Sequence, residues 1–469
     1  MGKYYLAVDI GASSGRHILG HLENGKIKLE EIYRFENGMD HKDGKLLWNV
    51  DRLFGEILNG MKKCKELGKI PVSMAIDTWA VDYVLLDAQD RILGETYGYR
   101  DHRTDGMDAE TAKILQETEL YARTGIQKQI FNTVYQLMAV KQQTPELLQR
   151  AKTLLMLPDY FGFRLTGNKL SEYTNGSTTQ LVDPATFQWD KELIQKLGYP
   201  EDIFLPLQMP GTKVGQLLPE IQKKVGFNLE VVLCGSHDTA SAVMAVPQTE
   251  GDGIYISSGT WSLMGIESLK PIINKDAAAA NFTNEGGYDH RFRFLKNIMG
   301  LWMIQSVRHE YNDAYSFAQL CEMAEDSRDF PSRVDVNDPS FLSPDSMVEA
   351  IKKYCQKMGQ PVPESVGELA SVVYRSLAQS YGETVSSLEK IAGRTYDSIH
   401  IIGGGSNAAY LNQLTADATG KTVYAGPGEA TAIGNLLAQM IYAEELTDLK
   451  SARQCVRDSF EIKTFVPAK

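Results

Sequence analysis

The order of predicted strands and helices is the same in both halves of the sequence, and this repeat constrains the fold most. In the first copy, residues 4–10 and 16–22 are β-type runs joined by a Gly-rich turn, and a third run covers 27–35. Apolar residues then recur every three or four positions after a predicted N-cap at Asp51, which predicts an amphipathic helix. A fourth strand is predicted at 72–76. The first copy therefore follows the order β, β, β, α, β.

The second copy begins with a strand, a polar Gly turn and another strand over residues 254–266, and residues 292–295 supply a third strand. Helical periodicity follows at 299–311 and again, over a longer stretch, at 368–391. A buried-type strand at 400–402 ends at three glycines. Two copies of one unit predict an α/β protein of two domains.

We expect the boundary between these domains in Val246-Pro247-Gln248, which gives domains of residues 1–246 and 247–469. A length of 469 residues at about 150 residues per domain agrees with two or three domains.

The charge and the cysteines exclude some classes of function and location. The formal net charge is −12, which disfavours a nucleic-acid partner, because such proteins bind phosphates with Lys and Arg. The five cysteines are scattered without metal-ligand spacing and are expected to be reduced thiols. With no signal-peptide pattern and no apolar run of about 18 residues, the sequence predicts a cytoplasmic protein without a membrane partner.

Two of the predicted hairpin turns have the composition of a phosphate-binding loop. Residues 9–16 read Asp-Ile-Gly-Ala-Ser-Ser-Gly-Arg, and residues 257–260 read Ser-Ser-Gly-Thr. Backbone N–H groups at such turns can approach an anion closely, although Gly and Ser are also common in turns without a ligand. Two such loops on separate domains could hold one nucleotide triphosphate. The glycines at 403–405 suit either a surface against an adenine ring or a flexible turn.

Asp238 follows a buried-type strand and opens a helix of small residues, with His237 beside it. An Asp at that position is often only a helix cap, so the local pattern leaves both a cap and a catalytic role open. A serine-hydrolase reading is disfavoured because no G-x-S-x-G elbow is present. Residues 76–83, Ile-Asp-Thr-Trp-Ala-Val-Asp-Tyr, combine carboxylates with aromatic rings that could hold a sugar or belong to the core.

Longer strings along nearly the whole chain carry a family resemblance. They are AVDIGASSGR (7–16), IDTWAVDYVLLD (76–87), YRDHRT (99–104), FNTVYQL (131–137), PDYFGFRLTG (158–167), EYTNGSTTQL (172–181), SHDTASAV (236–243), SSGTWSLMG (257–265), NFTNEGG (281–287), KNIMGLW (296–302) and GGGSNAAYLNQL (403–414). In this ordered set the chain resembles the FGGY carbohydrate kinases. The resemblance implies two ribonuclease H-like (actin/hexokinase-like) domains facing a central cleft.

The resemblance also implies the roles of individual residues. Contacts to ATP would come from Ala12, Ser13, Ser14, Gly15, Arg16, Thr260, Gln305, Gly403 and Gly404. Contacts to the sugar would come from Ala80, His237, Thr239 and Asn297. Asp238 would be the catalytic base, and Asp9 would hold Mg²⁺ through water. The N-terminal domain would bind the sugar, and the C-terminal domain would bind the nucleotide.

The activity that the resemblance implies is ATP- and Mg²⁺-dependent phosphorylation of the 1-hydroxyl of L-rhamnulose, a step of L-rhamnose catabolism. It implies a ketose and ATP as partners, with no obligate protein partner. The alternatives are a kinase for another ketose, L-fuculose or xylulose, and a filament-forming or chaperone-like ATPase on the same fold. Two positions depart from the family strings: Ala80 replaces a Gly near the sugar, and Gly176-Ser177 replaces Ala-Thr.

Overall fold

The computed structural model describes residues 2–248 and 253–468, and the chain divides into two compact units. Neither unit is continuous in sequence. The first comprises residues 1–245, 267–294 and 431–459, and the second comprises 246–266, 295–430 and 460–469. Each unit contributes strands to a large sheet, which confirms the predicted α/β class with two sheet-containing units. The predicted domain boundary near residue 246 stays a prediction.

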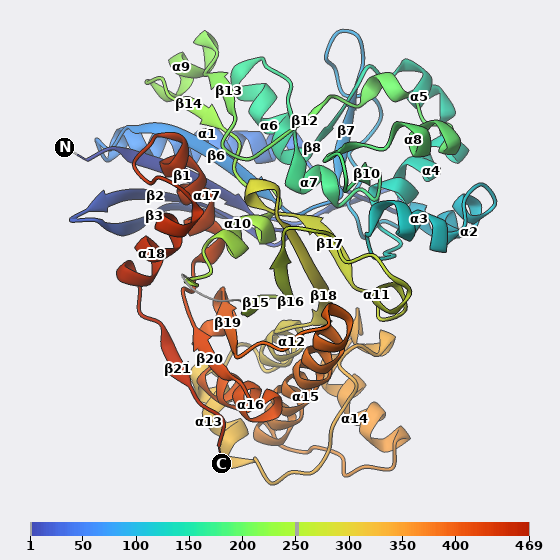
Figure 1. Ribbon diagram of the computed structural model, residues 1–469, viewed down its shortest axis with the longest axis vertical. Coiled ribbons are helices and arrows are strands. Elements are labelled where there is room, and N and C mark those ends of the chain that lie inside the picture. Colours follow the sequence, from blue (N-terminus) through green and yellow to red (C-terminus); the bar gives the residue numbers. More distant parts are fainter. Residues whose placement is uncertain (1, 249–252, 469) are drawn as a thin grey trace. The chain divides into compact units, whose positions relative to one another are not determined.

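The first unit is built on a six-stranded sheet with the order β13-β14-β6-β1-β2-β3 (Figure 1). Its strands are β1 (Tyr4–Ile10), β2 (Ser14–Glu23), β3 (Lys26–Glu36), β6 (Pro71–Thr78), β13 (Lys213–Gln216) and β14 (Glu230–Val232). The first three strands are antiparallel neighbours, and β6 is parallel to both β1 and β14. The order of the predicted strands in the first copy is therefore confirmed.

A seven-stranded sheet has the order β17-β18-β16-β15-β19-β20-β21. Its strands are β15 (Ile254–Ser258), β16 (Trp261–Ser268), β17 (Thr283–Gly286), β18 (Phe292–Met299), β19 (Ser398–Ile402), β20 (Thr422–Ala425) and β21 (Lys463–Phe465). Within it, β18-β16-β15-β19-β20 repeats the order β3-β2-β1-β6-β14 of the first sheet, and β19 is parallel to both of its neighbours β15 and β20. The predicted duplication is thus present in the strand order.

The other elements are helices, 3₁₀ turns and short strand pairs. The helices before residue 246 are α1 (Val50–Glu66), α2 (Met107–Ala112), α3 (Glu117–Thr124), α4 (Thr133–Gln143), α5 (Pro145–Arg150), α6 (Leu157–Thr166), α7 (Tyr173–Ser177), α8 (Lys191–Leu197), α9 (Pro219–Val225) and α10 (Asp238–Met244). The later helices are α11 (Lys275–Ala279), α12 (Trp302–Glu310), α13 (Phe317–Asp326), α14 (Met347–Lys357), α15 (Val366–Ala392), α16 (Ala409–Thr419), α17 (Ala430–Tyr442) and α18 (Leu449–Ser459). The short strands pair as β4 (Asp40–Lys42) with β5 (Lys45–Leu47), β7 (Tyr83–Leu86) with β8 (Thr153–Met156), β9 (Ser171–Glu172) with β12 (Leu207–Gln208), and β10 (Val182–Asp183) with β11 (Gln188–Trp189).

Both faces of the first sheet are buried, and strand alternation explains how. Successive side chains of a strand point to opposite faces. Leu6, Val8 and Ile10 of β1 lie in one cluster with the apolar side of α1, whereas Tyr5 and Ala7 lie in another with α17. The residues of α17 in that second cluster are Ala432, Leu436 and Met440. A helix close to the C-terminus therefore completes the core around the first strand.

Two predicted helix starts are wrong. The N-cap of α1 is Asn49, whose side chain accepts a hydrogen bond from the backbone of Arg52, and Asp51 lies in the first turn instead. Asn and Asp are almost equally good caps, so either residue was compatible with the sequence. The helix predicted at residue 299 begins at Trp302, because β18 continues to Met299.

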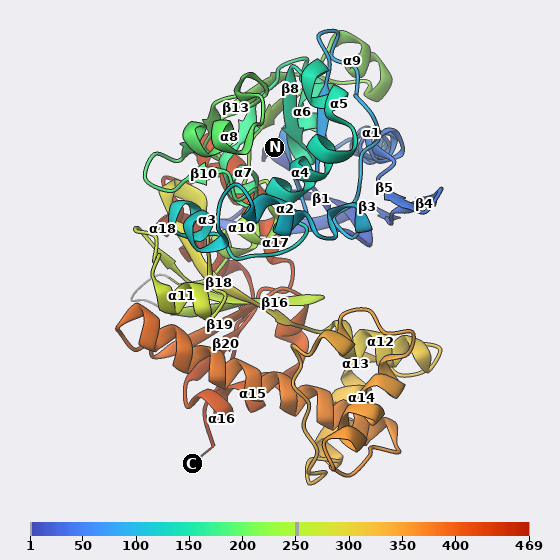
Figure 2. The ribbon, with the colours of Figure 1, turned by 90° about the vertical axis from the view of Figure 1, so that its right-hand side faces the viewer.

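In the second unit, α15 is the longest helix and packs against α13 and α16 (Figure 2). It begins with a capping box of Ser365 and Glu368 and ends at Gly393 in the left-handed conformation. Within residues 2–248 and 253–468, no helix has the length and hydropathy needed to cross a membrane.

Candidate active site

The turn between β1 and β2 gathers Ala12, Ser13, Ser14, Gly15 and Arg16 at one end of the first sheet. The turn is closed by a backbone hydrogen bond of 2.8 Å from the N–H of Gly11 to the carbonyl of Ser14. Asn37 braces it from β3's side, because its backbone N–H donates to Ser13 and its side chain donates to Gly11. Backbone and side-chain hydrogen bonds thus hold the turn that is predicted to bind phosphate.

Asp9 and Arg16 face each other across this hairpin. They are register partners, and the guanidinium donates to Oδ2 of Asp9 through Nε at 3.2 Å and through Nη2 at 2.9 Å. The Arg16 side chain is 19% exposed, so its charge stays near the surface of the turn. A guanidinium beside a Gly-Ser turn suits a phosphate group.

Asp77 lies next to Asp9, in register on the parallel strand β6. It is fully buried, and its Oδ2 accepts a hydrogen bond of 2.6 Å from Asn435, while its Oδ1 has no partner within the described part of the chain. Burial, with the nearby charges of Asp9 and Asp238, raises the pKa of Asp77 well above its usual range. Three carboxylates therefore interact here although they come from distant segments.

The carboxylates of Asp9 and Asp77 fit a Mg²⁺ ion that takes most of its ligands from phosphates and water. Within residues 2–248 and 253–468 there is no cluster of three or more His, Cys, Asp or Glu side chains with the geometry of a metal site. Mg²⁺ in phosphoryl-transfer sites usually takes only one or two carboxylates, with phosphates and water as the other ligands. Asp9 and the Asp77 oxygen without a hydrogen-bond partner provide these two carboxylate ligands.

Asp238 is the first residue of α10, but its side chain does not cap this helix. The N-cap position belongs to His237, which makes no side-chain cap hydrogen bond. The Asp238 carboxylate instead accepts a hydrogen bond of 3.0 Å from the Thr239 hydroxyl and is about one-third exposed. Burial raises the pKa of Asp238, partly offset by His237. A carboxylate that is accessible and not needed as a cap is available for chemistry.

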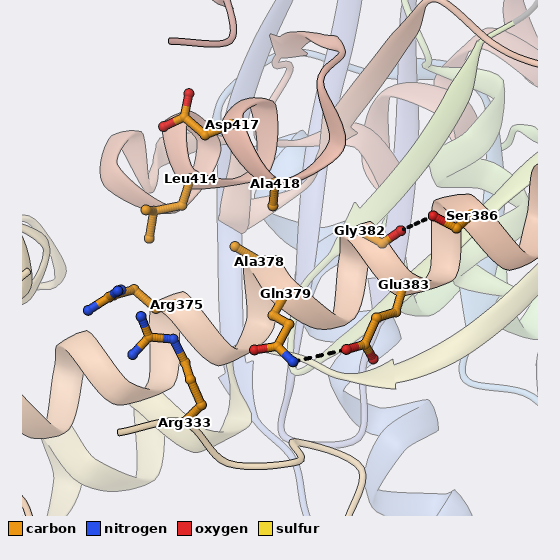
Figure 3. A pocket seen from close by; sticks show the side chains of 10 residues that line it. All are labelled: Arg333, Arg375, Ala378, Gln379, Gly382, Glu383, Ser386, Leu414, Asp417 and Ala418. Carbon is orange, nitrogen blue, oxygen red and sulfur yellow. Dashed lines mark hydrogen bonds between the residues drawn. The ribbon is translucent and has the colours of Figure 1, made fainter. Parts of the chain in front are cut away.

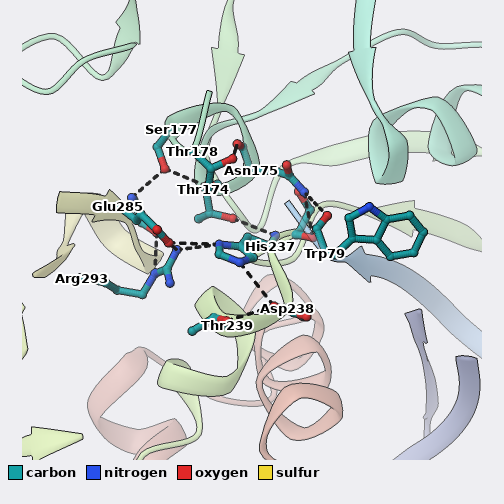
Figure 4. Close-up of polar contacts among 12 residues, drawn as sticks. Trp79, Thr174, Asn175, Ser177, Thr178, His237, Asp238, Thr239, Glu285 and Arg293 are labelled. Carbon is teal, nitrogen blue, oxygen red and sulfur yellow. Dashed lines mark hydrogen bonds and ion pairs between the residues drawn. The ribbon is translucent and has the colours of Figure 1, made fainter. Parts of the chain in front are cut away.

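His237 is held by two charged residues from a later segment (Figure 4). Its Nδ1 lies 3.0 Å from Nη2 of Arg293 and 3.3 Å from Oε2 of Glu285, and its Nε2 lies 3.4 Å from Oδ1 of Asp238. The sequence assigned no role to Glu285 or Arg293, which lie 48 and 56 positions after His237. Glu285 does lie in the NFTNEGG string of the family resemblance, and that string was the available signal, whereas Arg293 lies in none of the strings.

The loop after β6 carries Ala80 next to a strained residue. Val81 has a φ of 66°, in the left-handed region that a β-branched side chain rarely adopts. Its carbonyl accepts hydrogen bonds from Thr133 at 2.7 Å and Gln136 at 3.3 Å, which hold the loop in this conformation. Thr78, the last residue of β6, forms a β-bridge with His237, the N-cap residue of α10. The loop that carries Ala80 therefore begins next to His237, and both belong to the first unit.

The aromatic residues of this loop belong to the core. Trp79 is buried, and its ring lies against Trp48 with centroids 4.0 Å apart. Both indoles donate to Oδ2 of Asp82, at 2.9 Å and 2.6 Å. Burial raises the pKa of Asp82 to about 6 despite these hydrogen bonds and one from Gln136. The sequence left open whether the aromatic rings of residues 76–83 contact a sugar or belong to the core. Trp79 belongs to the core.

In the second unit, the predicted nucleotide residues lie around the turn between β15 and β16. The backbone N–H of Trp302, the first residue of α12, donates to the carbonyl of Thr260, and Gln305 lies half-buried one turn later. Gly403 follows β19 with a φ of 82°, and an added Cβ there would lie 3.0 Å from the Ser258 carbonyl. A side chain at Gly403 would therefore meet both strain and a close contact. Because a side chain does not fit at Gly403, the backbone of this turn is what can lie against a ligand.

Gly404 begins the short 3₁₀ turn after β19, and an added Cβ there would meet nothing within 4 Å. Asn297 lies on β18, and its Oδ1 is buried without a hydrogen-bond partner among the residues that the structure describes. Because Asn297 belongs to the second unit and the other predicted sugar contacts belong to the first, their convergence on one sugar stays a prediction.

A hollow of about 550 Å³ lies elsewhere on the second unit, between α15 and α16 (Figure 3). Its lining consists of Arg333, Arg375, Ala378, Gln379, Gly382, Glu383, Ser386, Leu414, Asp417 and Ala418. None of the residues predicted to bind ATP or sugar lines it. Both guanidiniums donate to backbone carbonyls.

Comparisons with known proteins identify the family of this chain. The sequence model of the FGGY family of carbohydrate kinases, N-terminal domain, matches residues 4–245, and the model of the C-terminal domain matches residues 254–443. A protein named Rhamnulokinase from Halalkalibacterium halodurans is 53% identical, and the match covers 99% of both chains. One of the same name from Bacillus subtilis is 46% identical over 99% of this chain and 94% of its own.

Solved structures show the same fold at low sequence identity. The xylulose kinase from Lactobacillus acidophilus has a TM-score of 0.80 at 16% identity, and the match covers 99% of this chain and 94% of that one. The glycerol kinase from Plasmodium falciparum, solved with ADP, has a TM-score of 0.78 at 14% identity over the same shares. The family models and the full-length relatives together establish that this chain belongs to the FGGY family of carbohydrate kinases.

Proposed function

We propose that this protein transfers the γ-phosphoryl group of ATP to the 1-hydroxyl of L-rhamnulose, giving L-rhamnulose 1-phosphate in L-rhamnose catabolism. The observation that carries the proposal is the Asp238 carboxylate, which is partly exposed, does not cap α10, and adjoins His237 and Thr239. The relatives named Rhamnulokinase, similar over 99% of this chain, support L-rhamnulose over L-fuculose or xylulose.

In this mechanism Asp238 accepts the proton of the 1-hydroxyl as the hydroxyl oxygen bonds to the γ-phosphorus of ATP, the bond from that phosphorus to the bridging oxygen breaks, and ADP leaves. Phosphoryl transfer depends chiefly on positioning and charge neutralisation, so one carboxylate beside the attacking hydroxyl is sufficient as the base. His237, Thr239 and the loop at Ala80 would orient the sugar, and Asn297 would complete its contacts. The raised pKa of Asp238 brings its basicity closer to that needed to accept a proton near neutral pH.

The nucleotide would be held by the two predicted turns. The turn from Ala12 to Arg16 and Thr260 would contact the phosphates, and Gln305, Gly403 and Gly404 would line the rest of the nucleotide. Mg²⁺, when bound, supplies positive charge to the phosphate oxygens. Asp9, through water, and Asp77 would hold it.

The test is a comparison of L-rhamnulose, L-fuculose and xylulose as substrates, with ADP formation measured and the product's phosphate position assigned by NMR. We expect the highest kcat/KM with L-rhamnulose and a 1-phosphate product. A higher value with another ketose would assign the protein to that sugar. ATP hydrolysis that no ketose stimulates would support the chaperone-like or filament-forming ATPase instead.

Asp238→Asn tests the base directly. Its turnover should fall about 10²- to 10⁴-fold with little change in sugar affinity. The matched control is Asp448→Asn, because Asp448 does cap a helix, accepting from the N–H of Ser451 at 2.8 Å. Asn caps about as well as Asp, so this control should keep normal turnover. Normal turnover in Asp238→Asn would remove Asp238 from the mechanism.

We also infer a cytoplasmic location, supported by the five cysteines, which are all free. The net charge of −12 supports a sugar and ATP rather than nucleic acid as partners.

A further inference from the structure

Arg293 is among the largest side chains that are completely buried in the described part of the first unit. It lies on β18, its Nε donates to the carbonyl of Gly286 at 2.8 Å, and its Nη2 lies 3.0 Å from Nδ1 of His237. A buried guanidinium is costly unless an opposite charge compensates it. Oε2 of Glu285, 3.1 Å from the same Nη2, supplies that charge.

The chemistry of arginine fixes the direction of its hydrogen bond to His237. A guanidinium remains protonated and has only donors, so Nδ1 of His237 is the acceptor in its 3.0 Å contact with Nη2 and carries no proton. Oε2 of Glu285, 3.3 Å from Nδ1, then pairs with the guanidinium at 3.1 Å rather than with the imidazole. A neutral imidazole has one N–H, which is then on Nε2. That nitrogen lies 3.4 Å from Oδ1 of Asp238.

From this geometry we propose that Arg293 selects the Nε2–H tautomer of His237, so that Asp238 rather than His237 accepts the proton of the sugar hydroxyl. The inference rests on the proposed function and adds two positioning residues to it, Arg293 and its counter-ion Glu285. His237 and Asp238 are adjacent, and either could otherwise act as a base. With Nδ1 occupied by Arg293 and Nε2 protonated, His237 is a donor only.

The surrounding contacts hold this arrangement from several sides (Figure 4). The strand that carries Glu285 is tied to α7, because the N–H of Gly286 donates to the hydroxyl of Ser177 at 2.8 Å. The backbone N–H of His237 donates to the hydroxyl of Thr174 at 3.3 Å. The ring and its charged partners are thus anchored to the same helix.

The first test needs no change to Arg293. The side-chain nitrogens of the wild-type enzyme, labelled with ¹⁵N at histidine, are observed by NMR, and His237→Gln identifies the signals of His237. We expect Nε2 at the position of a protonated nitrogen and Nδ1 at that of an unprotonated one. A proton on Nδ1, with or without one on Nε2, would overturn the proposal.

The second test removes the selecting residue. Arg293→Met alone leaves Glu285 buried without a cation and could prevent folding, so the double variant Glu285→Gln/Arg293→Met is the main one. We expect it to lose the single tautomer and to lower kcat roughly 10- to 100-fold, with a smaller change in the sugar KM. Arg293→Lys keeps a buried donor and should recover part of the loss. A folded double variant with wild-type kcat would refute the positioning role.

Arg453 and Glu267 provide the matched control, because they form another Arg–Glu pair in the first unit, with Arg453 buried and Glu267 partly buried. Arg453 donates to the carbonyl of Val243, at the opposite end of α10 from Asp238. Glu267→Gln/Arg453→Met should lower the thermal stability but leave both His237 nitrogens at their wild-type positions. A tautomer change in this control as large as in the Arg293 variant would contradict the specific role of Arg293.

The tautomer measurement separates this inference from the proposed function. If the wild-type enzyme phosphorylates L-rhamnulose but His237 carries its proton on Nδ1, the inference fails and the function stands. If His237 has the expected tautomer but no ketose is phosphorylated, the proposed function fails, and with it the assignment of Asp238 as the acceptor.

Discussion

Asn435 donates its side-chain amide to Asp77 at 2.6 Å, although 358 positions separate the two residues in the sequence. The same amide reaches the carbonyl of Ala75 at 3.2 Å, and Gln439 donates to the Asn435 oxygen at 2.8 Å. All of these side chains are buried. Through α17, the C-terminal part of the chain thus fixes the orientation of a carboxylate at the predicted phosphate site.

Asn435→Ala should therefore destabilise the protein and lower its affinity for Mg²⁺ at the predicted phosphate site. Leaving one buried carboxylate oxygen unpaired costs about 1–3 kcal/mol, so we expect a lower Tm and a higher Mg²⁺ requirement. The control is Asn228→Ala, because Asn228 donates to Gln216 on the surface. Equal Tm values for the two variants would contradict the structural role of Asn435.

Two glycines on α1 should respond in opposite ways to the same substitution. An added Cβ at Gly60 would lie 2.2–2.3 Å from ring atoms of His17, which is fully buried, whereas one at Gly55 would meet nothing within 4 Å. Gly55→Ala should raise stability by up to about 1 kcal/mol through helix propensity. Gly60→Ala should lower it by about 1–3 kcal/mol through overpacking. Thermal unfolding measures both, and a stabilising Gly60→Ala would show that His17 moves freely.

His17 should contribute to the loss of stability in acid. Burial lowers the pKa of His17 from 6.5 to about 4. Between these two pH values His17 is protonated in the unfolded chain but neutral in the folded chain. Stability from this group is fully present above pH 6.5 and declines as pH falls toward 4, by at most about 3 kcal/mol. We expect His17→Gln to have a flatter dependence of unfolding free energy on pH in that window. Parallel pH curves for the two proteins would contradict the shifted pKa.

Ala80→Gly should change the KM for the ketose more than the KM for ATP. The added methyl group of Ala80 lies on a loop that Thr133 and Gln136 hold through the Val81 carbonyl, so the loop cannot relax away from a sugar. Ala185→Gly, the same change in an exposed turn, is the control and should alter neither KM. A larger effect of Ala80→Gly on ATP would place this loop outside the sugar site.

The decrease of turnover at acidic pH should follow the protonation of Asp238. Its carboxylate works as a base only when deprotonated, and burial raises its pKa above the usual 3.8. Turnover should therefore fall as the pH decreases through a value above 3.8, while circular dichroism still shows a folded protein. Constant turnover down to that pH would mean that another group accepts the proton.

The strand order could be predicted from the sequence because the signals are local. Alternating β-type runs separated by Gly turns determine that Tyr4–Ile10 pairs with the next strand, and the same pattern recurs at Ile254–Ser258. The helix starts were less certain, since Asn49 and Asp51 cap equally well and only the surrounding backbone decides between them.

Contacts between distant segments could not be predicted in the same way. Asp77 was noticed as a carboxylate at a strand end, but its neighbour Asp9 depends on the parallel register of two strands. Arg293 appears in the sequence as one of several basic residues, between Arg291 and Lys296, and nothing local shows that it contacts His237. Such partners are determined by tertiary packing.

The return of α17 to the first strand has a consequence for how this protein is made. Tyr5 and Ala7 emerge early from the ribosome, but Ala432 and Leu436, which cover them, follow more than 400 residues later. At about 5–20 residues per second, the stretch between residues 245 and 431 alone takes roughly ten to forty seconds to synthesise. During that interval the nascent chain exposes an apolar sheet face that invites aggregation. Cotranslational holding by a chaperone is therefore more valuable to this protein than to one whose domains are completed in sequence order.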